Sequence, residues 1–145
     1  MKEVFERRVS KGIIPSASFI AYVQYSIMIG DQKTVQKLVN LGFGSLYPKL
    51  SWFERIYILD LAQKMKLDNV DHMLQLSLFS FQTVGIQDFL EPSKVDINGN
   101  ALSVSASIIV KFMQSLFLSG VENKDVWRKL EVILAATYNG QMQQL

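Results

Sequence analysis

Residues Phe19 to Val35 read FIAYVQYSIMIGDQKTV, an apolar run followed by a glycine, an acid and an amide. A second stretch repeats this order: Ile108 to Leu118 reads IIVKFMQSLFL, and the pentad ENKDV follows at Glu122 to Val126. When Ser26 is aligned with Ser115, apolar residues coincide at seven of the eleven positions of the two apolar runs. The similarity indicates that the chain contains a repeated unit.

A third copy lies between these two. Arg55 to Met65, RIYILDLAQKM, places Ala62 at the shared small position, and an acid and an amide follow at Asp68 and Asn69. The small residue therefore recurs at positions 26, 62 and 115, with spacings of 36 and 53. The second spacing exceeds the first by 17, which is the length of the stretch VGIQDFLEPSKVDINGN from Val84 to Asn100. Without this insert the period is 36 throughout.

A period in the mid-thirties is typical of stacked helical hairpins. One hairpin is too small to bury its own apolar face, so neighbouring hairpins must stack. The acid–amide pair suits the start of the second helix of each hairpin, because unpaired N–H groups and the helix dipole favour an acidic residue there. The alternative is a chance similarity among apolar helices. The repeat predicts an all-α fold, a short α-solenoid of about three helical hairpins.

The whole chain, 1–145, is predicted to form a single helical-repeat domain. Its units cover residues 12–44, 45–83 and 101–140, with a non-helical insert at 84–100. First helices are expected at 16–29, 51–66 and 103–119, and second helices at 31–41, 68–83 and 122–138.

Two local patterns add detail to this map. Ser51 and Glu54 form the S-x-x-E pattern of a capping box before an apolar run. Within the insert, Asn98-Gly99 is typical of a β-hairpin turn. A two-stranded ribbon therefore competes with the following helix for the residues after the turn.

Composition favours a folded chain that works inside an assembly. Of the 145 residues, 49% are hydrophobic and 19% are charged, so the chain carries more apolar surface than one small globule readily hides. The formal net charge of +2 permits a nucleic-acid partner without requiring one. The absence of cysteine excludes disulfides, thiolate zinc sites and cysteine nucleophiles.

No pattern of residues indicates catalysis, and we expect no enzyme activity, no cofactor, no metal and no small-molecule substrate. The only histidine, His72, shares a helical face with Asp68, which is typical of a helix N-terminus carrying acids; a partial metal site is the alternative. Residues 12–30 contain no charge, but Pro15, three serines and Gln24 interrupt them. A helix start and a buried helix therefore explain this stretch better than a membrane span.

Basic residues are the best candidates for a binding surface. If equivalent faces of stacked hairpins line up, they can form a stripe that faces phosphates; ordinary solvated helix faces are the alternative. The candidate RNA-binding residues are Arg7, Arg8, Lys11, Lys33, Lys37, Lys124, Arg128 and Lys129.

Val4 to Leu38 resembles a pentatricopeptide repeat: Lys11 to Pro15 reads KGIIP, Phe19 is the early aromatic, and Gly30 is the glycine between the helices. The later units, such as LSVSASIIVKFMQSLFLSGVENKDVWRKLE at Leu102 to Glu131, resemble the repeats of FAST-kinase-like and octotricopeptide-type organellar proteins.

These resemblances imply a mitochondrial setting and work on or beside RNA. The base-selecting position of a pentatricopeptide repeat is usually polar, whereas this chain has Ile20 there. The expected function is therefore a non-enzymatic structural subunit of an organellar ribonucleoprotein, with a mitochondrial ribosome as the first choice. Its partners would be RNA, such as ribosomal RNA, and neighbouring protein subunits. The alternatives are a free RNA-binding adaptor and a helical subunit of a membrane-bound complex.

Overall fold

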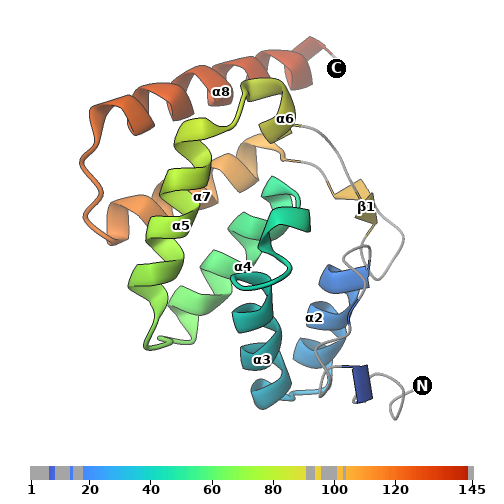
Figure 1. Cartoon of the computed structure of the whole chain (residues 1–145). Helices are drawn as coiled ribbons and strands as arrows, with labels where there is room; N and C mark the ends of the chain where they lie inside the picture. The colour runs from blue at the N-terminus through green and yellow to red at the C-terminus, as the bar shows by residue number, and fades with distance from the viewer. Residues whose placement is uncertain are drawn as a thin grey trace.

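The fold is helical, as the sequence predicts. The computed structural model describes residues 7–8, 14, 18–90, 94–95, 101–102 and 104–143. Its elements are α2 (Phe19–Met28), α3 (Gln32–Gly42), the 3-10 turn η2 (Tyr47–Lys49), α4 (Trp52–Lys64), α5 (Val70–Thr83), α6 (Ile86–Leu90), β1 (Lys94–Val95), β2 (Ala101–Leu102), α7 (Ala106–Leu118) and α8 (Lys124–Gln143). Helices α2–α3, α4–α5 and α7–α8 form hairpin 1, hairpin 2 and hairpin 3 (Figure 1).

The first helix of every hairpin ends in the same way. Its last turn closes with a residue in the left-handed conformation: Gly30 at φ 74°, Lys66 at φ 55° and Gly120 at φ 74°. The next backbone N–H then bonds to a carbonyl five residues earlier, as in a Schellman motif. These bonds run from Asp31 to Ser26 at 2.9 Å, from Leu67 to Ala62 at 3.2 Å and from Val121 to Leu116 at 3.0 Å.

These helix ends correct the repeat register of hairpin 3. Ser26 and Ala62 are equivalent, as predicted, but their counterpart is Leu116 rather than Ser115. The shift from hairpin 2 to hairpin 3 is therefore 54 residues, not 53. Apolar runs tolerate a slip of one residue in an alignment, whereas a helix terminus fixed by hydrogen bonds does not.

The same shift of 54 residues relates the other helix ends of the two hairpins. The side chain of Ser51 caps α4 by accepting from the Glu54 N–H at 3.3 Å, and the Ser51 N–H in turn donates to the Glu54 carboxylate at 2.9 Å, which confirms the capping box. Ser105 caps α7 by the equivalent bond, and Asn69 and Asn123 precede α5 and α8. Hairpin 3 is a positional copy of hairpin 2.

Helix α4 lies at the centre of the packing and contacts α3, α5 and α7 (Figure 1). Hairpin 3 stacks on hairpin 2 through both of its helices, since α7 packs on α4 and α8 packs on α5. Hairpin 1 joins this stack mainly through α3 and α4. Gly42 permits the close approach of α3, because a Cβ at this position would lie 2.8 Å from atoms of both Phe19 and Ile58.

Four buried aromatic rings join hairpins 2 and 3. Trp52 lies 5.1 Å from Phe89 and 6.1 Å from Phe112, measured between ring centroids. Phe81 meets Phe89 and Phe112 edge to face at 5.3 Å and 5.5 Å. The rings come from α4, α5, α6 and α7, so this cluster fixes four helices against one another.

The prediction that residues 84–100 are non-helical is wrong at Ile86–Leu90, which form α6. Phe89 explains the difference, because it is fully buried in the aromatic cluster and one helical turn carries it there. Strand β1 pairs with β2 in antiparallel register, Lys94 opposite Leu102. The predicted turn at Asn98-Gly99 lies outside the described residues, so the hairpin as a whole stays a prediction.

Replacing Lys66 by glycine is expected to stabilise the protein. A residue with a Cβ at positive φ costs about 1 kcal/mol relative to glycine, and Gly30 and Gly120 occupy the equivalent places. We expect Lys66→Gly to raise the free energy of unfolding by about 1 kcal/mol in urea titrations. Lys64→Gly, in the last turn of α4, is the matched control and should lower the free energy of unfolding by up to about 1 kcal/mol. A loss of stability in both variants would contradict the claim that the backbone at Lys66 is strained.

Candidate interaction surfaces

An apolar groove runs between the two helices of hairpin 3. It has a volume of about 520 Å³. Helix α7 contributes Val110, Met113, Gln114 and Phe117, and α8 contributes Trp127 and Leu134. Of the described residues that line it, none carries a charge.

The rim of this groove exposes large apolar side chains. Phe117 is 74% exposed and Leu118 is 81% exposed. On α7 the groove residues are spaced i, i+3, i+4 and i+7, so they form one stripe along the helix. Another stripe on α7, Ile109, Phe112 and Leu116, is buried in the core. Helix α7 is thus apolar on two faces. One is buried in the core, whereas Val110 and Phe117 on the other stay exposed in the part of the chain that the structure describes.

Sequence reasoning treated α7 as a core helix and missed the groove. The available signal was that IIVKFMQSLFL is apolar nearly all round, which is typical of a helix with neighbours on more than one side. Trp127 is half-buried in the groove wall, and its indole N–H donates to the Val121 carbonyl at 2.9 Å.

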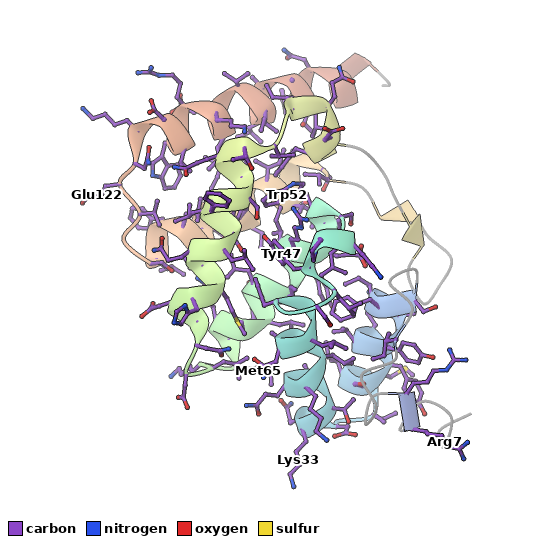
Figure 2. All side chains as sticks on the ribbon, viewed as in Figure 1. Arg7, Lys33, Tyr47, Trp52, Met65 and Glu122 are labelled. Atoms are coloured by element: carbon purple, nitrogen blue, oxygen red, sulfur yellow. The ribbon has the colours of Figure 1, made fainter. Side chains whose placement is uncertain are left out.

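The basic residues predicted to bind RNA lie in two separate places. Arg7, Lys33 and Lys37 belong to the N-terminal part and are exposed. Figure 2 shows Arg7 and Lys33 at the lower end of the molecule, whereas α8, which carries Lys124 and Arg128, lies along its upper edge. The described cations therefore do not form one continuous stripe. Arg8 is exposed and donates to the Tyr22 hydroxyl at 3.3 Å, and Lys11 lies outside the described residues.

Lys129 is turned toward the protein. Its ammonium group donates to the backbone carbonyls of Phe81 at 2.5 Å and Val84 at 2.6 Å, at the C-terminal end of α5. It also lies 4.8 Å from the centre of the Phe81 ring. Burial lowers the pKa of this ammonium from its ordinary value. Lys129 therefore links α8 to α5, and its positive charge interacts with backbone carbonyls and the Phe81 ring of the same chain.

His72 lies in a small pocket between α3 and α5, of about 270 Å³. Asn69 donates to the side-chain carbonyl of Asn40 across this pocket at 3.1 Å, and Phe43 forms part of the wall. In the described part of the chain, no three histidine, aspartate or glutamate side chains are grouped to hold a metal ion.

Arg55 packs against two aromatic rings. Its guanidinium lies 4.3 Å from the centre of the Tyr47 ring and 5.0 Å from that of Trp52, and it donates to the Tyr47 carbonyl at 3.0 Å. Burial lowers the pKa of Arg55, while Tyr47 and Glu54 act in the opposite direction. The arrangement anchors η2 to α4.

The chain matches no protein-family model, no curated protein and no solved structure. Among the helices that the structure describes, none has both the length and the apolar character needed to cross a membrane.

Removing the Lys129 ammonium should destabilise the fold. Lys129→Met keeps the aliphatic stem but leaves two helix-end carbonyls without their donor, so we expect the free energy of unfolding to fall by about 1–3 kcal/mol. Chemical denaturation measures this loss. The adjacent Arg128→Met removes an exposed cation and should change stability by less than about 0.5 kcal/mol. Equal effects of the two substitutions would show that the Lys129 contacts contribute nothing.

Proposed function

We propose that this protein is a non-enzymatic helical subunit of an organellar ribonucleoprotein assembly, with a mitochondrial ribosome as the first candidate. Its hairpins act as a short α-solenoid that contacts neighbouring proteins through apolar faces and RNA through exposed cations. The mitochondrial and RNA parts of this proposal rest on the resemblance to pentatricopeptide and related organellar repeats.

The observation that carries the proposal is the exposure of large apolar side chains. Phe117 and Leu118 stand at the rim of an uncharged groove, and Met28 is 69% exposed at the end of α2. Monomeric soluble proteins rarely leave such contiguous patches uncovered, whereas subunits of assemblies bury them against partners. A free RNA-binding adaptor needs no surface of this kind, so the assembly is the better supported function.

The exposed cations suit a contact with RNA phosphates at the N-terminal end. Lys33 and Lys37 lie one turn apart on α3, and both side chains are exposed. Arg7 lies at the same end of the molecule as Lys33 (Figure 2). Two or three such cations can position the protein on an RNA backbone but cannot read its sequence. This limited role fits a subunit held mainly by protein contacts.

Sedimentation of the tagged protein from an organelle-enriched lysate tests the proposal. We expect the protein to migrate with a particle of ribosomal size and to leave that position after ribonuclease digestion, because RNA holds the particle together. Migration at the top of the gradient with and without ribonuclease would overturn the ribonucleoprotein assignment.

The RNA contact has its own control in the purified protein. Lys33→Ala/Lys37→Ala should weaken binding to single-stranded RNA roughly tenfold. The slope of log affinity against log salt concentration should become less steep by about one to two. The control variant Lys64→Ala/Lys111→Ala also removes two positive charges. These two lysines, however, form ion pairs with Asp60, at 2.9 Å and 3.8 Å. This control should leave RNA affinity unchanged, and equal losses in both variants would argue against a local RNA site on α3.

A further inference from the structure

The α7 wall of the groove corresponds to a surface of α4 that is already occupied in hairpin 2. The shift of 54 residues that relates the two hairpins maps one set of residues onto the other. The α7 groove residues Val110, Met113, Gln114 and Phe117 fall on Ile56, Leu59, Asp60 and Gln63 of α4.

In hairpin 2 this surface receives α7. Gln63 donates to the Ser115 carbonyl at 3.2 Å and to the Ser119 hydroxyl at 3.0 Å, and Asp60 lies 3.8 Å from the Lys111 ammonium. Ile56 and Leu59 are fully buried on the same helix. The groove therefore continues an established helix–helix interface by one further repeat.

The chemistry of the groove differs from that of its counterpart in one respect. Asp60 and Gln63 are replaced by Gln114 and Phe117, so a polar and charged seam becomes an uncharged and more apolar one. A charged helix face would lose its hydration there without gaining an ion pair. The groove therefore favours a helix whose docking face carries apolar and small uncharged side chains, and it disfavours a phosphate backbone.

We propose that the groove between α7 and α8 binds an amphipathic helix of a partner protein, which occupies the place that α7 occupies on α4. This inference rests on the proposed role as an assembly subunit. The partner helix presents aliphatic and aromatic side chains at i, i+3 or i+4, and i+7, with small residues where the helices approach closely. Phe117 and Trp127 are the anchors of this site, since large aromatic side chains dominate such interfaces.

A peptide that reproduces the docking face of α7 tests the proposal. Residues 104–121 with Lys111→Ala, because the groove has Gln114 where Asp60 pairs with Lys111, carry a fluorescein label and a terminal lysine tag for solubility. This peptide is titrated with the full-length chain and followed by fluorescence anisotropy without RNA. We expect saturable binding that Phe117→Asp weakens by about tenfold or more, because the substitution places a carboxylate in an apolar site. The matched control is Phe79→Asp, since Phe79 is 67% exposed on α5 outside the groove. This variant should bind the peptide like the unaltered chain.

Several outcomes would overturn the proposal. Binding that Phe117→Asp leaves unchanged would show that the peptide sits elsewhere, for instance on α4 in place of α7. Equal binding of a peptide with the same residues in scrambled order would show an unspecific apolar contact. Self-association of the chain that Phe117→Asp abolishes would make a second copy the occupant. These results are separate from the sedimentation test, because a groove that binds no helix leaves ribonuclease-sensitive migration unaffected.

Discussion

The packing of four aromatic rings between hairpins 2 and 3 is the interaction on which the rest of the structure depends. Trp52, Phe81, Phe89 and Phe112 come from four different helices and are all buried. Each ring removes a large apolar area from water, and their edge-to-face contacts restrict the angles between the helices. Because the cluster fills the space between α4, α5 and α7, hairpin 3 must stack on hairpin 2 in one register. Lys129 also links hairpin 3 to hairpin 2, because its ammonium group joins α8 to the C-terminal end of α5.

In this register one apolar side of α7 stays exposed among the described residues, at Val110 and Phe117. Helix α7 uses Ile109, Phe112 and Leu116 for the core, and its stripe from Val110 to Phe117 lines the groove. A helix with two apolar faces gains stability from a second partner, which is the general logic of stacked repeats. The exposed cations of α3, Lys33 and Lys37, lie at the other end of the molecule (Figure 2), so protein docking and RNA contact are proposed for separate surfaces.

Sequence reasoning predicted the helices well, because apolar periodicity and helix-end chemistry are local. The S-x-x-E pattern at Ser51 and the glycine between the helices of hairpin 1, Gly30, have their expected roles. An alignment of apolar runs does not detect the slip of one residue in hairpin 3, because only the helix ends fix the register. The helix at Ile86–Leu90 was missed because the burial of Phe89 depends on long-range packing. Lys129 was grouped with the RNA-binding cations for the same reason: its sequence neighbours give no sign of the α5 carbonyls that it meets. The groove could be foreseen only from the unusual apolar content of α7.

The central claim is that the groove repeats the interface between α4 and α7 in register, and disulfide pairing measures this directly. The chain has no cysteine, so single cysteines can be placed in the protein and in the peptide of residues 104–121 without side reactions. Gln63 lies beside Ser119 and Asp60 beside Lys111 in the existing interface. By the 54-residue shift, Gln114→Cys in the protein should therefore pair faster with Lys111→Cys than with Ser119→Cys in the peptide, and this variant leaves the anchor Phe117 in place. Equal rates for the matched and exchanged pairs, or no pairing at all, would contradict the account.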